Sequence, residues 1–366
     1  MKVLQIIDVY KHGGAEKVFD AYREFCKNES IEIESVSMYK SENEKLAFLQ
    51  ETNAHGIWGK LFQQICALSK FRKMIKECGI EKIVSFLDRS NILSIMASSR
   101  KIPVVATVHN PPTVQYQKLG KLKHGVFFLL RYFYNKKNVS VIAVSNQVKE
   151  SLESIGVRKV KIVYNPLLAP SLTDVKIPFE LSKPYFVFVG RLSYQKAPWK
   201  LIKGFAYFHH TSKKNIHLVI VGDGELRTEL EKLSEDSQTQ NFVHFTGFVK
   251  NPMEIIRNAY CMIFSSYYEG FPITVLESFL CDVPVIGSRV ALPKEIREQL
   301  PFDDFYYDNT ELTENFDAMV YGPDDCRLAE ILEKAFVEKE KVKKIASAGN
   351  KWVRENCSID NFKLYE

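Results

Sequence analysis

Short apolar runs alternate with helical stretches along the first half of the chain. The opening run covers residues 2–9, a helical period follows over residues 15–27, and a second run covers residues 31–39. Three later runs are equally short, rich in β-branched residues and bounded by turn or charged residues: residues 82–87, 103–109 and 139–145. One of the helical stretches, residues 145–156, opens with an N-cap candidate, Ser145. The pattern predicts a parallel sheet with helices between its strands.

The same alternation returns in the second half, after a proline-rich segment without a clear period. That segment, residues 167–183, is the predicted linker between a first domain, residues 1–166, and a second domain, residues 184–366. Five apolar runs follow the linker: residues 185–190, 216–224, 241–247, 261–266 and 283–288. One long amphipathic helix is predicted over residues 326–347, and residues 361–366 are expected to return toward the first domain. We therefore predict an α/β protein with two doubly wound, Rossmann-like domains that face each other across a cleft and bind ligands at the carboxyl ends of their strands.

The composition excludes several classes of protein. The 366 residues are 46% hydrophobic and 26% charged, as in a soluble globular protein and unlike a disordered chain. No apolar run approaches the ~20 residues that span a bilayer, and the first residues lack the features of a signal peptide. Seven scattered cysteines form no C-x-x-C pair, which favours a reducing cytoplasm over a disulfide framework or a zinc site.

The net charge of +6 is unevenly distributed. Residues 1–170 contain 26 Lys/Arg and 15 Asp/Glu, a net charge of +11, and the remainder carries −5. No acidic residue occurs between Asp88 and Glu150, a stretch of 61 residues that holds ten Lys/Arg. A run of one charge is often only a solvated face. A stretch of this length also suits an anionic partner of the first domain.

Glycines follow several of the predicted strands. Gly13 and Gly14 lie between the opening strand and a helix, where backbone can approach a ligand and the helix N-terminus can bind an anion. Gly222 ends a strand of the second domain in the same way. An ordinary tight turn explains each of these glycines as well. The G-x-G-x-x-G pattern is absent, which disfavours a dinucleotide dehydrogenase.

Basic side chains and a histidine follow other strands. Arg191 and Lys196 lie in a loop that leads to a helix with Pro198 in its first turn, and together they can hold a diphosphate. Taken singly, each is more often a solvated surface cation. His109 ends a buried-type strand, where a histidine is more often a hydrogen-bonded structural residue than a functional one.

Two glutamates, Glu269 and Glu277, lie eight residues apart around a Gly-Phe-Pro turn. Residues 274–277 fit a capping box with Thr274 as N-cap, which explains Glu277 and leaves Glu269 unexplained. In the alternative, the helix that starts near Thr274 receives a phosphate, and the two carboxylates beside it accept hydrogen bonds from sugar hydroxyls. The chain has no Asp-x-Asp motif, so this alternative requires no divalent metal.

The order of these motifs resembles that of the retaining glycosyltransferases of family 4, which have the GT-B fold. The motifs are VGRLSYQK, VGDGEL, FTGFV and YEGFPITVLES…PVIGS, the last with the spacing E-x(7)-E. The resemblance runs nearly end to end, but its specific motifs lie mostly in the second domain. The chain departs from the family pattern at Ala197-Pro198, Ser278 and Asp282, where that family often has glycine, alanine and glycine. These departures bear on packing near the donor site more than on its charge.

The resemblance implies a role for each matching residue. Arg191 and Lys196 would neutralise the departing diphosphate, Glu269 would bind hydroxyls of the donor sugar and Glu277 those of the ribose, with His109 beside the transferred sugar. Backbone groups would cradle sugar and phosphate: Gly13, Gly14, Gly222, Gly270, Phe271, Pro272, Ile273 and Thr274. The family transfers with retention, the leaving phosphate helping to take the acceptor proton. No cofactor or metal is expected beyond the nucleotide-sugar itself.

Residues 116–138 combine six Lys/Arg with clustered Phe, Tyr and Leu and contain no acid. As one amphipathic helix they would form an interfacial element, because each Lys/Arg near an anionic leaflet contributes on the order of 1 kcal/mol. The side chains expected at the membrane or the acceptor are Lys118, Lys121, Lys123, Phe127, Phe128, Arg131, Lys136 and Lys137. The alternatives are a core helix with inward-facing aromatic side chains and a nucleic-acid surface, for which the sequence has no module.

The sequence therefore predicts a cytoplasmic transferase, peripheral on the inner face of the plasma membrane. It would move a hexose or N-acetylhexosamine from a nucleotide-sugar, UDP-linked by family habit, to a lipid-linked oligosaccharide in the synthesis of a surface polysaccharide such as O-antigen or capsule. Two alternatives use the same frame: a sugar-nucleotide epimerase or hydrolase, and a non-catalytic protein that binds a nucleotide-sugar. The sequence specifies neither the donor sugar nor the linkage nor the oligomeric state.

Overall fold

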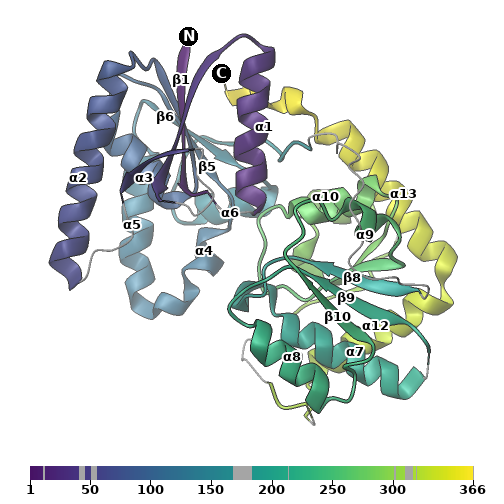
Figure 1. Ribbon diagram of the computed structural model, residues 1–366. Helices are drawn as coiled ribbons and strands as arrows, with labels where there is room; N and C mark the ends of the chain where they lie inside the picture. Colours follow the sequence, from purple (N-terminus) through teal and green to yellow (C-terminus); the bar gives the residue numbers. More distant parts are fainter. Residues whose placement is uncertain are drawn as a thin grey trace. The chain divides into compact units, whose positions relative to one another are not determined.

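The computed structural model shows a chain built from two parallel sheets and the helices around them (Figure 1). It describes residues 1–10, 13–40, 46–50, 56–167, 184–212, 214–300, 302–309, 316–318 and 320–365. The chain divides into an N-terminal unit, Met1–Leu168 with Cys357–Glu366, and a C-terminal unit, Ala169–Asn356. Nearly all of the predicted linker, residues 168–183, lies outside the described residues. The two sheets confirm the predicted α/β class.

The sheet of the N-terminal unit has the order β3-β2-β1-β4-β5-β6-β7, with every pair parallel. Its strands are β1 Lys2–Val9, β2 Glu32–Tyr39, β3 Ala47–Gln50, β4 Lys82–Phe86, β5 Val104–Val108, β6 Val139–Ala143 and β7 Val160–Ile162. β4 and β5 are buried at every position, as expected for strands of a parallel sheet that helices cover on both faces. The chain order reverses between β1 and β4, and such a switch point is where doubly wound sheets bind ligands.

The helices of this unit follow the prediction except at the basic, aromatic segment. They are α1 Gly14–Asn28, α2 Gly56–Glu77, α3 Asp88–Ala97, α4 Pro112–Gln115, the 3-10 helix η1 Gln117–Leu122, α5 Lys123–Tyr134 and α6 Asn146–Ser154. Ser145 is the N-cap of α6, as predicted, because its Oγ accepts a hydrogen bond from Val148 N at 3.3 Å. The predicted single helix over residues 116–138 is wrong. Gly120, within η1, has φ 55° and ψ −127°, a conformation outside the right-handed helical region, so the segment is kinked before α5 begins at Lys123.

The sheet of the C-terminal unit has the order β10-β9-β8-β11-β12-β13, again parallel. Its strands are β8 Tyr185–Val189, β9 His217–Val221, β10 Val243–Gly247, β11 Cys261–Phe264, β12 Val285–Ser288 and β13 Tyr306–Tyr307. The five apolar runs of the second half all form strands, and the two-residue β13 is an addition. The switch point of this sheet lies between β8 and β11.

The helices of the C-terminal unit differ from the prediction at their end. They are η2 Tyr194–Lys196, α7 Pro198–Ser212, α8 Arg227–Asp236, α9 Met253–Arg257, α10 Ile273–Leu280, η3 Arg289–Ala291, α11 Lys294–Arg297, α12 Pro323–Val337 and α13 Lys339–Asn356. α7 starts at Pro198, as predicted. The predicted single helix over residues 326–347 is wrong, since α12 ends at Val337 and the next residue, Glu338, has the non-helical angles φ −99° and ψ 51°. α12 packs against α7 and α13 against α10, and one straight helix could not cover both.

The last residues of the chain pack inside the N-terminal unit. The 3-10 helix η4, Ile359–Tyr365, lies along α1. The ring of Phe362 lies 5.2 Å from that of Tyr22 and 5.7 Å from that of Phe25, and the ring of Tyr365 lies 5.4 Å from that of Tyr22. These aromatic contacts cover the buried face of α1.

Candidate functional site

Two loops at the switch point of the C-terminal sheet are joined by hydrogen bonds. One loop follows β8 and the other follows the neighbouring strand β11. Gln195 Nε2 donates to Tyr268 O at 2.9 Å, and Tyr267 N donates to Gln195 O at 2.9 Å. Ser265 Oγ donates to Ala197 O, also at 2.9 Å. The side chains of the two loops are therefore held beside each other.

The joined loops bring Lys196 and Glu269 into contact. Lys196 Nζ lies 2.6 Å from Glu269 Oε1, and Ser266 Oγ donates to the same oxygen at 2.6 Å. The side chains are only 16% and 5% exposed, so water screens their charges little. Glu269 Oε2 makes no hydrogen bond within the described part of the chain. The pair thus presents a fixed cation to an anion and a carboxylate oxygen to a hydroxyl.

The half-buried amide of Asn309 braces the loop that carries Glu269. Asn309 Nδ2 donates to Ser266 O at 2.5 Å, and Asn309 Oδ1 lies 3.5 Å from Lys200 Nζ of α7. Lys200 also forms a buried ion pair with Asp324 of α12. Sequence reasoning missed this support because Asn309 lies 43 residues from Ser266 and 109 from Lys200. The signal is visible only once β13 places Asn309 near the loop.

The predicted capping box at α10 is wrong. α10 begins at Ile273, its N-cap is Pro272 with φ −70° and ψ 119°, and no side chain caps it. Proline suits this place because its fixed φ and missing N–H cost nothing just before a helix. Thr274 therefore lies inside the first turn, and Glu277, buried in the next, has no capping role. The amides of this first turn, which begins four residues after Glu269 in the sequence, carry partial positive charge.

Among the other donor residues predicted in this unit, Arg191 is accessible to a ligand, whereas Gly222 and Phe271 are constrained by packing. Arg191 is exposed in the loop after β8 and forms no ion pair with any described residue, so an anion can reach it. Gly222 has φ 139°, and a Cβ there would lie 1.9 Å from Gly190 O. The packing of the loop after β9 against the loop after β8 therefore requires glycine at this position. Phe271 is buried against Trp352, at a ring distance of 6.1 Å, which leaves only its backbone for a ligand.

His109, predicted beside the transferred sugar, lies in the N-terminal unit at the end of β5. Its Nε2 is 3.1 Å from Thr107 Oγ1, which donates its own proton to Ser85 O at 2.9 Å. Nε2 must therefore carry the proton of the imidazole. Burial lowers the pKa of His109 to about 4, so the ring is neutral at pH 7. His109 can offer Nδ1 as an acceptor to a hydroxyl, but it cannot supply positive charge.

Gly13 and Gly14 open α1, with Gly13 as its N-cap. The carboxylate of Glu16 lies against Gly13, where a Cβ would be only 2.6 Å from Glu16 Oε2. A negative charge at this helix N-terminus disfavours a phosphate and favours a sugar hydroxyl. The two glycines and His109 belong to one unit, and Arg191, Lys196, Glu269 and Glu277 belong to the other.

Sequence reasoning missed two carboxyl groups at the switch point of the N-terminal sheet. Asp8 Oδ1 accepts hydrogen bonds from Ser90 N and Ser90 Oγ, both at 2.7 Å, and burial raises the pKa of Asp8 to about 6. Asp88 accepts from Tyr116 OH at 2.7 Å and Tyr134 OH at 2.9 Å, and burial raises its pKa too. Neither forms an ion pair with a described residue. The available signal was that these acids end β1 and follow β4, on the two sides of the switch point.

Two protein-family models match the chain. The model for group 1 glycosyl transferases matches residues 173–300, and the model for glycosyltransferase family 4 matches residues 49–167. Together they span about two thirds of the chain, with one model in each half. The family resemblance predicted from the sequence motifs is confirmed.

Relatives and solved structures agree with these matches. The chain is 28% identical, over 89% of its length and 86% of the relative's, to GalNAc-α-(1→4)-GalNAc-α-(1→3)-diNAcBac-PP-undecaprenol α-1,4-N-acetyl-D-galactosaminyltransferase of Campylobacter jejuni. It is 30% identical to a lipopolysaccharide 1,6-galactosyltransferase of Salmonella typhimurium, over 40% of its own length and 42% of that protein's. The structure of HepE from Anabaena with UDP and glucose matches with a TM-score of 0.75 and 17% identity, over 100% of this chain and 98% of that one. WaaG, a glycosyltransferase of lipopolysaccharide biosynthesis, matches with a TM-score of 0.72 and 15% identity, over 99% and 98%. At such identities the structural matches show the fold alone.

Proposed function

Because the chain belongs to the family of group 1 and family 4 glycosyltransferases and has their GT-B fold, we propose that it transfers a hexose or N-acetylhexosamine, with retention, from a UDP-sugar to a lipid-linked oligosaccharide. The product would belong to a surface polysaccharide. Relatives of the chain are transferases named for an undecaprenol-linked glycan and for lipopolysaccharide. A structural neighbour was solved with UDP and glucose. These names support the proposed acceptor and donor.

One observation carries the proposal: the contact between Lys196 and Glu269 at the switch point of the C-terminal sheet. A nucleoside diphosphate leaves readily when fixed charges and dipoles meet its growing negative charge. Lys196, the exposed Arg191 and the uncapped first turn of α10 can supply those charges. Glu269 Oε2 would accept a hydrogen bond from the donor sugar, and Glu277 would bind the ribose. In this proposal His109 is a neutral hydrogen-bonding partner of the sugar.

Metal independence is part of the proposal. Across the described ranges, no group of three His, Cys, Asp or Glu side chains converges as a metal site would require. Lys196, Arg191 and the amides of α10 would take the place of a metal in neutralising the diphosphate. EDTA should leave the activity unchanged, and added divalent ions should not increase it.

Binding of UDP tests the donor site directly. A ligand that binds only the folded protein stabilises it by about 2.7 kcal/mol at 100 times its Kd, so UDP should raise the Tm measurably. The Lys196→Ala variant should lose most of this shift, because the exposed Arg191 would then be the one remaining cation proposed for the diphosphate. Lys351→Ala, which removes an exposed lysine of α13, is the matched control and should behave like the wild type. No shift in the wild-type protein at millimolar UDP would contradict the proposal.

Peripheral membrane association is also proposed, through the segment from η1 to α5. None of the helices in the described ranges has the length and apolar character needed to cross a bilayer. Phe128, Leu122 and Tyr132 are 68%, 76% and 56% exposed beside the lysines of the segment. This exposure opposes the alternative of a core helix with inward-facing aromatic side chains. Only Leu130 and Tyr134 of α5 are buried among its described residues.

Flotation with vesicles tests the membrane proposal. The protein should float with vesicles of phosphatidylglycerol at low salt and should be released at high salt, because screening weakens attraction between surface charges. Vesicles of phosphatidylcholine are the control and should bind it weakly. Absence of binding to the anionic vesicles at low salt would count against association through this segment.

A further inference from the structure

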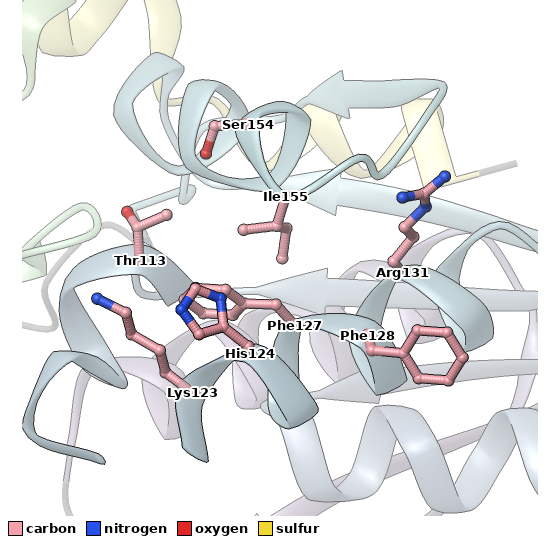
Figure 2. Close-up of a pocket in the computed structure, with 8 residues that line it drawn as sticks. All are labelled: Thr113, Lys123, His124, Phe127, Phe128, Arg131, Ser154 and Ile155. Carbon is pink, nitrogen blue, oxygen red and sulfur yellow. The ribbon is translucent and has the colours of Figure 1, made fainter. Parts of the chain in front are cut away.

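A cavity of about 520 Å³ lies in the N-terminal unit between α5 and the C-terminal end of α6 (Figure 2). α5 forms one wall, and the last residue of α6 with the residue after it forms the other. Figure 2 shows Ile155 pointing across the cavity toward Phe127, with Lys123 near one end and Arg131 near the other. The full lining is Thr113, Lys123, His124, Phe127, Phe128, Arg131, Ser154 and Ile155.

The charged side chains of the lining have one sign. Lys123 and Arg131 form no ion pair with any residue that the structure describes. They lie eight residues apart on α5, roughly 12 Å along a helix that rises about 1.5 Å per residue. The lining contains no acidic residue. Glu153, which precedes the lining residue Ser154, has its Oε1 3.9 Å from Lys149 Nζ. An anion can therefore enter the cavity without being repelled by a negative charge in its lining.

The middle of the cavity is apolar. Phe127 and Ile155 lie between the two basic ends. Phe128, at one margin, is 68% exposed, and it continues into the exposed side chains of Leu129 and Tyr132 on the same helix. Exposed apolar surface next to unpaired cations complements a ligand with an anionic head and a hydrocarbon body.

Hydrogen bonds at both ends set the spacing of the walls. At one end, Thr113 N donates to Ser151 Oγ of α6 at 3.0 Å. At the other, Asn135 Nδ2 donates to Gly156 O at 2.9 Å and Asn135 Oδ1 accepts from Arg158 N at 2.8 Å. The cavity is thus built into the fold before a ligand arrives, which reduces the cost of ordering it on binding.

Gly156 fixes the course of Arg131. It has φ 88°, and a Cβ there would lie 3.1 Å from both Cδ and Nε of Arg131. Any other residue at this position would strain the backbone and push the arginine aside. The geometry therefore holds the guanidinium at the end of the cavity.

We propose that this cavity binds the diphosphate of a lipid-linked acceptor, with the first part of its hydrocarbon chain on Phe127, Phe128 and Ile155. The inference rests on the proposed function for the existence of such an acceptor. It adds a defined place at which the acceptor is held, distinct from general attraction to an anionic surface. The apolar middle selects an amphiphile over a free phosphate, and the unpaired Lys123 and Arg131 select an anion over a neutral lipid.

Farnesyl diphosphate is a soluble probe of this cavity. Binding to the full-length protein is measured by calorimetry with the donor site saturated by UDP, and inorganic diphosphate and farnesol serve as comparisons. Farnesyl diphosphate should bind at least 10-fold more tightly than either. Lys123→Gln and Arg131→Gln should each weaken it by roughly 10-fold or more, since a hydrogen bond to a charged group contributes about 1.5–3 kcal/mol. Lys101→Gln removes the same charge at an exposed position outside the cavity and should change Kd less than 2-fold.

Several results would overturn the proposal. Equal losses in Lys123→Gln and Lys101→Gln would show attraction to net charge alone. Equal binding of farnesyl diphosphate and inorganic diphosphate would show a plain anion site. Gly156→Ala provides a second variant, which should weaken binding by displacing Arg131 without removing charge. UDP binding by every variant reports on folding and on the donor site, so failure of the cavity proposal is distinguishable from failure of the proposed function.

Discussion

Replacing Lys196 or Glu269 by alanine is expected to lower kcat by a factor of about 10²–10³, the usual consequence of removing one prearranged charge-stabilising group. In Lys196→Ala the lost charge is not replaced, because no other described cation lies within ion-pair distance of Glu269. Glu269→Ala removes both the partner of Lys196 and the free oxygen proposed for the sugar. The assay is release of UDP from a UDP-sugar in the presence of a lipid-linked acceptor.

Matched exposed variants separate this effect from a general loss of stability. Lys351→Ala and Glu340→Ala remove the same side chains from α13, where they are 76% and 81% exposed, and both should keep wild-type kcat. The Lys196→Gln variant should remain low, because an uncharged amide cannot neutralise a diphosphate. Near-normal kcat in purified, folded Lys196→Ala and Glu269→Ala would refute the site.

Replacing Lys203 by methionine is expected to lower the free energy of unfolding of the C-terminal unit by about 3–5 kcal/mol. Lys203 Nζ of α7 lies 3.2 Å from Asp325 Oδ2 of α12, and the two side chains are only 2% and 3% exposed. Methionine fills the space of the lysine stem but leaves Asp325 buried without its opposite charge. Water cannot take the place of the lost lysine, because Asp325 is buried. This burial also raises the pKa of Asp325. Urea unfolding followed by tryptophan fluorescence measures the change.

A double variant shows whether charge burial is the cause. Lys203→Met combined with Asp325→Leu should recover most of the loss, because a buried ion pair can often be replaced by apolar residues. About 1 kcal/mol should remain lost, since Asp325 Oδ2 also accepts a hydrogen bond from Gly322 N at the start of α12. Lys343→Met, in an exposed pair with Glu340, should leave the free energy of unfolding nearly unchanged, because water screens such a pair. Equal costs in Lys203→Met and Lys343→Met would disprove the explanation.

The strands were the most predictable part of the fold. Strands such as β4, β5, β8 and β9 are buried at every position, so each appears in the sequence as an uninterrupted apolar run with clear ends. The two candidate site residues that meet, Lys196 and Glu269, were predictable for a related reason. Each follows one of two runs that a doubly wound order places side by side.

What the sequence left open depends on contacts between distant segments. The two C-terminal helices share one amphipathic period, and only packing on α7 and α10 makes them separate at Glu338. Thr274 and Glu277 fit a capping box, but Pro272 takes the N-cap position instead. The hydroxyls that bind Asp88 come from Tyr116 and Tyr134, 28 and 46 residues away. Local pattern holds no information about such pairings.

The placement of η4 on α1 has a consequence for the order in which the protein is completed. During translation the N-terminal half of the chain emerges from the ribosome long before Phe362 and Tyr365 are synthesised. Until those two rings arrive, Tyr22 and Phe25 lack the aromatic cover described above, although every strand of their sheet has already been made. The domain whose synthesis begins first is thus finished last, and the nascent chain must keep an apolar helix face exposed throughout translation.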